Sequence, residues 1–294
     1  MRSVKEYSFK KFCGLLYRLE EKLRGTRLEL EDKHLWCSKE ERSVIRRNIA
    51  LRDFHRGAPA FVIGNGPSLG KQDLGRLKGQ VTFAMSGFWK HPVLNLWQPT
   101  YYCFADPMFF DGSNAMESFF TGLSSSVKDT RMLLPLSAHR SCVGKKLEAQ
   151  YAVYYMAFQG ALHRCSTTKV DFCKQIPGVT SVAQFAMLSA LYMGCSPIYL
   201  LGLDHDWLAQ RGNDRHFYAG KTVEGHARAH GDLGRIPYKT DLESVLQLWN
   251  GYERLGIIAS RNGSKIINLT DGGFLDVFPR ENLDDVLKRM KSDR

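Results

Sequence analysis

Short apolar runs alternate with stretches of helical spacing from residue 58 to the end of the chain. This alternation is typical of a parallel sheet whose strands are connected by helices. It predicts strands at 60–63, 81–85, 101–105, 131–134, 198–201 and 265–268, and helices at 181–193, 241–255 and 283–290. We therefore predict an α/β fold, with a Rossmann-like, mostly parallel sheet and flanking helices, preceded by a helical basic N-terminal segment.

Residues 1–57 differ from the rest of the chain, because they carry 15 Lys and Arg against 9 Asp and Glu and have almost no Gly or Pro. They are predicted to form the helical basic segment, with the Rossmann-like domain at 58–294. Apolar residues recur at helical spacing between positions 9 and 23, which indicates an amphipathic helix. Two interpretations stay open: the helix lies on an anionic membrane surface, or it packs on the main domain.

Charge and cysteine content narrow the classes of partner and compartment. The net charge of +11 favours phosphate-bearing partners without choosing among them. Nucleic acid is not predicted as a partner, since no helix-turn-helix, zinc-finger or RRM signature is present. The 7 cysteines include no CxxC pair, and neither a signal peptide nor a membrane-spanning run is recognisable. We predict a cytoplasmic protein. Peripheral association with the inner membrane and assembly into a homo-oligomer are both left open.

The sharpest local motif is FVIGNGPSL at 61–69, a strand that runs into a glycine-containing turn. Gly64 and Gly66 let backbone N–H groups approach an anion, and Asn65 and Ser68 can hydrogen-bond a ribose or phosphate. The motif is neither G-x-G-x-x-G nor a Walker A sequence, so it indicates neither NAD nor ATP. A purely structural turn is the alternative interpretation.

Four blocks of the chain together resemble a known family. They are FVIGNGPSL, ADPMFF, the run from TSVAQF to LLGLDHDWL, and NLTDGGFLDVFPR, spread over roughly residues 50–288. Their order and spacing resemble the MptE-like family of polysaccharide loci, named for a 6-hydroxymethylpterin diphosphokinase, and are similar to the bacterial family 42 sialyltransferases. The resemblance implies a modified Rossmann domain that binds a CMP-sugar.

The resemblance also implies a set of site residues. Gly64, Asn65, Gly66 and Ser68 match the turn that holds the donor phosphate and sugar. Thr180 and Ser181 match a Thr-Ser pair that begins a helix in the sialyltransferases, where N–H groups and the helix dipole favour an anion. Gly202, Leu203, Asp204 and His205 match the block that receives the nucleoside at the end of a strand.

At several positions this chain departs from the sialyltransferase pattern, and there the roles of the sialyltransferase residues cannot be assigned directly to its own residues. The asparagines that contact the donor there correspond here to Ser86 and Asp106. A carboxylate at Asp106 would repel an acidic sugar unless it is paired or protonated, so sialic acid itself is doubtful as the donor sugar. The catalytic histidine has no clean counterpart, and we predict His216 as the general base that deprotonates an acceptor hydroxyl. Asp204 is the second residue predicted to be catalytic.

The run Asp204-His205-Asp206 also has the D-x-D form by which metal-dependent glycosyltransferases hold a divalent ion. A structural or nucleoside-binding role for Asp204 is preferred, and no metal ligand is assigned. A CMP-sugar donor requires no cofactor, whereas a nucleoside diphosphate or triphosphate donor would require magnesium.

The sequence thus predicts a glycosyltransferase that uses a nucleotide-activated sugar, most simply a CMP-sugar, to modify a bacterial surface polysaccharide or a lipid-linked glycan. Its partners would be the nucleotide-sugar donor and the glycan acceptor. Two alternatives stay open: an ATP- and magnesium-dependent transferase of the 6-hydroxymethylpterin pyrophosphokinase type, and a catalytically inactive nucleotide-binding module.

Overall fold

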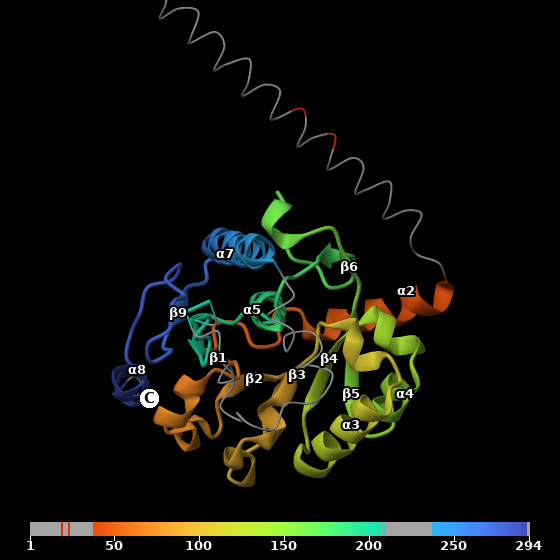
Figure 1. The fold of residues 1–294 in the computed structure, drawn as a ribbon, viewed down its shortest axis with the longest axis horizontal. Coiled ribbons are helices and arrows are strands. Elements are labelled where there is room, and N and C mark those ends of the chain that lie inside the picture. Colours follow the sequence, from red (N-terminus) through yellow and green to blue (C-terminus); the bar gives the residue numbers. More distant parts are fainter. Residues whose placement is uncertain (1–18, 20–22, 24–37, 207, 210–236, 293–294) are drawn as a thin grey trace, which may run out of the picture.

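The computed structural model describes residues 19, 23, 38–206, 208–209 and 237–292 (Figure 1). Its centre is a seven-stranded parallel sheet with the strand order β5-β4-β3-β2-β1-β8-β9. The strands are β1 (Ala60–Ile63), β2 (Val81–Met85), β3 (Tyr101–Cys103), β4 (Arg131–Pro135), β5 (Ala152–Met156), β8 (Ile198–Leu201) and β9 (Ile266–Asn268). A separate two-stranded sheet pairs β6 (Phe158–Gln159) with β7 (Ile176–Pro177). The predicted α/β class is confirmed.

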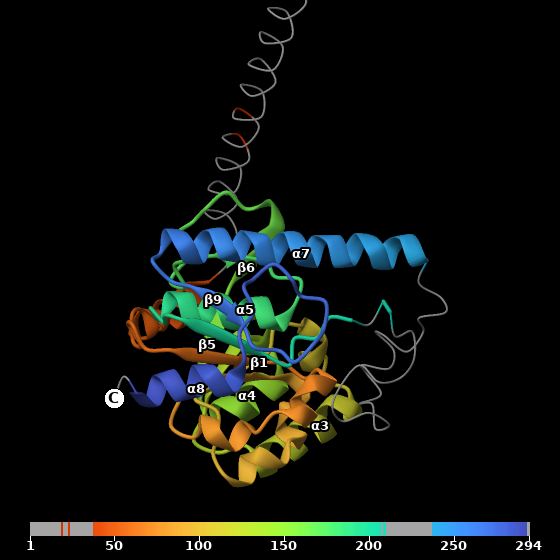
Figure 2. The same cartoon turned by 90° about the vertical axis from the view of Figure 1, so that its left-hand side faces the viewer.

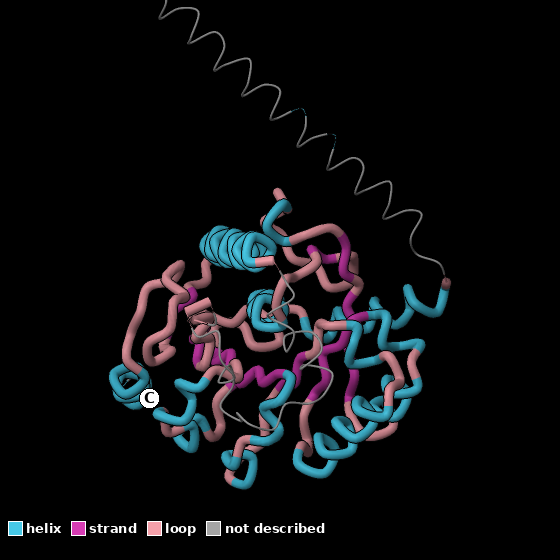
Figure 3. The backbone as a smooth tube through the Cα atoms, viewed as in Figure 1, coloured by secondary structure: helices cyan, strands magenta, loops and turns pink. Residues whose placement is uncertain are grey.

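Helices cover both faces of the large sheet and produce three layers (Figures 1 and 3). The helices are α2 (Lys39–Arg46), α3 (Asn114–Ser126), α4 (Cys142–Glu148), α5 (Val182–Tyr192), α7 (Tyr238–Arg261) and α8 (Leu283–Ser292). One apolar core lies between one face of the sheet and the helices α5 and α7. The other core lies between the opposite face and the helices α3, α4 and α8. Figure 2 shows α7 running across the face that α5 also covers.

The central strand β1 is a continuous apolar run because both of its faces are buried. Phe61 and Ile63 belong to one core and Ala60 and Val62 to the other, and all four side chains are fully buried. Successive strand residues point to opposite faces, so burial between two helical layers favours apolar residues at every position.

Much of the predicted N-terminal segment lies outside the described residues. Its described part packs on the α/β domain: Ile45 and Leu51 are buried, and the side chain of Asn48 donates to the carbonyls of Tyr155 and Phe172 at 2.7 and 2.8 Å. The boundary at residue 57 stays a prediction, as does the amphipathic helix between residues 9 and 23. In the described part of the chain, no helix is both long and apolar enough to cross a membrane.

Candidate functional site

The strand order places the topological switch point of the sheet between the carboxyl ends of β1 and β8. Strands β1 to β5 extend to one side of β1, whereas the chain returns through α5 to place β8 on the other side. The connections therefore leave these two neighbouring strands in opposite directions. Open α/β sheets bind ligands at the carboxyl ends of such a pair of strands. The turns at 64–68 and 202–206 both lie at this edge.

The two turns lie against each other so closely that glycine is required. A Cβ on Gly64 would lie 2.4 Å from the carbonyl oxygen of Gly202, and a Cβ on Gly66 would lie 1.6 Å from Oδ2 of Asp204. The backbone angles of Gly66, φ −64° and ψ 154°, are open to any residue, so close approach and not conformation selects glycine there. Gly202 has φ +64° and contacts the side chain of Leu69.

Asp204 fastens the glycine turn to the end of β8. Its Oδ1 accepts the backbone N–H of Ser68 at 3.1 Å, and its Oδ2 accepts the Ser68 hydroxyl at 2.9 Å. Asp204 is only 7% exposed, and this burial raises the pKa of its carboxyl above the ordinary aspartate value. These contacts assign Asp204 a positioning role, while its predicted catalytic role stays a prediction.

Asn65 connects the glycine turn to the end of β2, where Ser86 follows the strand. The amide Nδ2 of Asn65 donates to the carbonyl of Met85 at 3.1 Å, whereas its Oδ1 is buried without a hydrogen-bond partner. Ser86 is buried with φ +46°, and its carbonyl accepts the hydroxyl of Tyr102 at 2.7 Å. An unpaired buried oxygen beside a glycine turn is an acceptor that a bound hydroxyl or amine would satisfy.

The Thr-Ser pair begins helix α5 at the same edge. The hydroxyl of Ser181 caps the helix by accepting the N–H of Gln184 at 3.3 Å. In return, Oε1 of Gln184 accepts the N–H and the hydroxyl of Thr180 at 3.0 and 2.9 Å. This reciprocal cap orders the first turn, whose N–H groups carry the positive end of the helix dipole.

Tyr252, on helix α7, joins the Thr-Ser pair to the end of β8. Its hydroxyl is hydrogen-bonded to Nε2 of His205 at 2.7 Å and lies 3.4 Å from Oγ of Ser181. His205 also packs against Trp249, with ring centroids 5.9 Å apart. Burial lowers the pKa of the His205 imidazole to about 3, so the ring is neutral at physiological pH.

The structure therefore brings together three of the segments to which the sequence assigned site residues. Asp204 joins the turn at 64–68 to the β8 end, and His205 with Tyr252 joins the β8 end to the α5 start. Asp106 follows β3, two strands from β1, and its exposed carboxylate accepts the N–H of Met108 within its own turn. His216 lies outside the described residues.

Three elements of this edge were not predicted. Tyr252 falls within the helix predicted at 241–255, but nothing in that helix marks one tyrosine as a site residue. Gln184 and Thr270 were also missed; the hydroxyl of Thr270 accepts the N–H of Leu203 at 3.2 Å. The S-x-x-Q spacing of Ser181 and Gln184 is a capping-box pattern and was the one available signal.

Asp204, the first residue of the D-x-D run, already accepts hydrogen bonds at both of its carboxylate oxygens. Both of these bonds come from Ser68, and within 38–206 and 237–292 no group of three or more His, Cys, Asp or Glu side chains is arranged to hold a metal ion. These hydrogen bonds give Asp204 a positioning role, and the metal dependence of the site stays a prediction.

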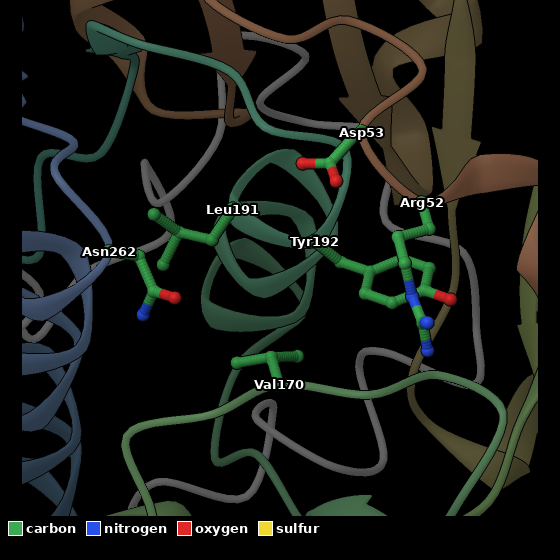
Figure 4. Close-up of a pocket in the computed structure, with 6 residues that line it drawn as sticks. All are labelled: Arg52, Asp53, Val170, Leu191, Tyr192 and Asn262. Carbon is green, nitrogen blue, oxygen red and sulfur yellow. The ribbon is translucent and has the colours of Figure 1, made fainter.

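A separate hollow of about 180 Å³ lies at the opposite, amino-terminal edge of the sheet (Figure 4). Its charged groups are already paired: Arg52 binds Asp171 at 2.8 Å, and Asp53 binds Arg56 at 2.7 Å. Leu191 and Tyr192 line it from the last turn of α5, where the helix dipole is negative. This hollow is therefore a poor site for a phosphate.

No protein-family model and no curated protein sequence matches the chain. Among solved structures, the chain is similar to the Maf glycosyltransferase from Magnetospirillum magneticum AMB-1, at 15% identity and a TM-score of 0.46, over 86% of this chain and 41% of that one. It thus spans less than half the length of that enzyme. It is also similar to the sialyltransferase CstII from Campylobacter jejuni in complex with cytidine-5'-monophosphate, at 14% identity and a TM-score of 0.45, over 76% of this chain and 85% of that one. A second structure of that sialyltransferase, with a trisaccharide acceptor and CMP, aligns with a TM-score of 0.42. The fold assignment rests on the strand order itself, and membership of the MptE-like family stays a prediction.

Proposed function

We propose that the protein is a glycosyltransferase that uses a nucleotide-activated sugar, with a CMP-sugar as the donor. The observation that carries this proposal is the meeting of the glycine turn, the β8 end and the start of α5 at one edge of the sheet. Backbone N–H groups of the turn and of a helix N-terminus suit a phosphate, and the switch point beside β8 suits a nucleoside. The acceptor would be a bacterial surface polysaccharide or a lipid-linked glycan.

In this mechanism, an acceptor hydroxyl attacks the anomeric carbon of the donor sugar, and the bond from that carbon to the phosphate oxygen breaks. A general base takes the hydroxyl proton, and His216 remains the candidate for that role. The N–H groups near Gly66 and Ser181 would stabilise the charge that develops on the departing nucleotide. Asp204 acts indirectly, because it holds Ser68 and with it the turn.

A pyrophosphokinase that uses ATP and magnesium is the second candidate, and the D-x-D run favours it. The engagement of both Asp204 oxygens by Ser68 argues against this candidate, because a magnesium ion would compete with those hydrogen bonds. A CMP leaving group carries a single phosphate and needs no metal to offset extra charge.

Thermal unfolding in the presence of CMP, CDP, UDP, GDP or ATP tests the donor class, each with magnesium or with EDTA. A ligand at 100 times its Kd adds about 2.7 kcal/mol of stability. We expect CMP or CDP to stabilise the protein in EDTA, and CMP-sugars to release CMP when an acceptor glycan is added. Stabilisation by ATP only with magnesium would favour the pyrophosphokinase, and CMP binding without turnover of any donor would favour an inactive nucleotide-binding module.

A further inference from the structure

The loop at 270–275 follows the carboxyl end of β9, the strand beside β8. It contacts the backbone of the β8 end directly. The N–H of Phe274 donates to the carbonyl of Asp204 at 2.7 Å, and a Cβ on Gly273 would lie 2.5 Å from the same oxygen. The loop is therefore pressed against the residue that holds the glycine turn.

One side chain holds this loop in shape. The guanidinium of Arg280 donates to four of its carbonyls: those of Thr270 at 3.2 Å, Gly272 at 2.5 Å, Gly273 at 3.0 Å and Leu275 at 3.0 Å. Arginine can do this because its planar fork presents five N–H donors in fixed directions, which lysine cannot reproduce. Gly272 and Gly273 both have positive φ, at 83° and 71°, so the loop has a defined and unusual backbone path.

The loop is also tied to the neighbouring helix. Nε1 of Trp249 donates to Oδ1 of Asp276 at 2.9 Å, and the same Trp249 ring packs against His205. Within this fastened segment, Phe274 leaves 54% of its surface exposed. An exposed aromatic side chain on a loop that is fastened to the β8 end is a surface on which a planar ring can stack with little loss of conformational entropy.

We infer that Phe274 stacks on the base of the bound nucleotide, and that Arg280 is the positioning residue that holds it there. This inference rests on the proposed nucleotide site and adds the residue that contacts the base. Stacking of a base on an aromatic side chain changes affinity by about 5- to 150-fold when the aromatic residue is replaced by alanine.

The test is the Kd of CMP and of ribose 5-phosphate, which lacks the base, measured by calorimetry for wild type and variants. Phe274→Ala should weaken CMP binding at least fivefold and leave ribose 5-phosphate binding unchanged, and Phe274→Trp should restore CMP binding. Phe54→Ala is the matched control, because Phe54 is also 54% exposed but precedes β1 at the amino-terminal edge. It should leave both affinities unchanged.

Arg280→Lys tests the positioning role through a double-mutant comparison. If Arg280 acts by holding Phe274, then Arg280→Lys should weaken CMP binding, and adding Phe274→Ala to it should have a much smaller effect than in the wild type.

Unchanged CMP affinity in Phe274→Ala, or an equal loss for CMP and ribose 5-phosphate, would overturn the inference while the nucleotide site stands. Failure of the wild type to bind any nucleoside monophosphate would instead overturn the proposed function and this inference together.

Discussion

Replacing Gly66 by alanine tests the close approach of the two turns at the candidate site. The backbone of Gly66 accepts alanine without strain, so the effect comes from the added methyl group alone. Its Cβ would lie 1.6 Å from Oδ2 of Asp204 and 2.5 Å from Cγ, so the carboxylate must move away and lose contact with Ser68. Overpacking of this kind costs about 1–3 kcal/mol, and loss of the hydrogen bond from the Ser68 hydroxyl to Oδ2 adds about 1.5–3 kcal/mol.

We therefore expect Gly66→Ala to reduce the free energy of unfolding by about 3–6 kcal/mol, which lowers Tm by roughly 10 °C in a domain of this size. Gly70→Ala is the control, because a Cβ there meets no atom within 4 Å, and its unfolding free energy should change by no more than about 0.5 kcal/mol. Chemical denaturation and calorimetry of both variants provide the comparison. Equal stability of the two variants would refute the argument that Asp204 occupies the space beside Gly66.

Three further predictions concern the polar groups of the same edge. Folding raises the pKa of Asp204, so the wild type loses stability as pH rises through that pKa and the carboxyl becomes charged. Asp204→Asn has no carboxyl to titrate and should lack this loss. Urea unfolding from pH 4 to 7 should therefore show the variant gaining stability relative to wild type. Folding lowers the pKa of His205 to about 3, so the stability that the neutral ring contributes is present above pH 6.5 and is lost as pH falls from 6.5 toward 3. In His205→Asn, where asparagine tolerates the positive φ of this position, urea unfolding over the same pH range should not show this acid-dependent loss of stability. Tyr252→Phe should lower the unfolding free energy by about 1–3 kcal/mol, because His205 and Ser181 lose a hydrogen-bond partner. An unchanged unfolding free energy in this variant would contradict the bridging role of Tyr252.

The central strands were predictable because their signal is local. Strands β1, β2, β4 and β8 are mostly apolar runs that begin and end within one residue of their predicted positions, since burial on both faces favours apolar residues. Helix α5 was predicted equally well, because its capping residue and the glycine at 194 mark both of its ends.

Elements that depend on tertiary contacts were missed or predicted too short. Helix α3 contains a glycine and many Ser and Thr residues, and it is stabilised by burying Met116, Phe119, Phe120 and Leu123 instead of by helix propensity. Helix α7 was predicted to end at 255, before Gly256. It continues to Arg261, and its Gly251 is required because a Cβ would lie 2.4 Å from Nε2 of Gln184.

The same distinction applies to the candidate site. The glycine turn and the Thr-Ser pair carry local signals, so both were identified from sequence. The loop at 270–275 and Arg280 lie within the block NLTDGGFLDVFPR, which the resemblance singled out without assigning a role to any of its residues. Tyr252 reaches the site from helix α7, and no local pattern links it to the site. The contact between Asp204 and Ser68 joins residues 136 positions apart, so only the folded chain shows that the carboxylate holds the turn.

A crystal structure with bound CMP is the most direct test of the nucleotide site. The CMP phosphate should lie within about 3.2 Å of backbone N–H groups in the turn at 64–68 or in the first turn of α5, with the nucleoside against the β8 end. CMP bound instead in the hollow beside Arg52 and Tyr192, at the opposite edge of the sheet, would contradict the assignment of this switch point as the nucleotide site.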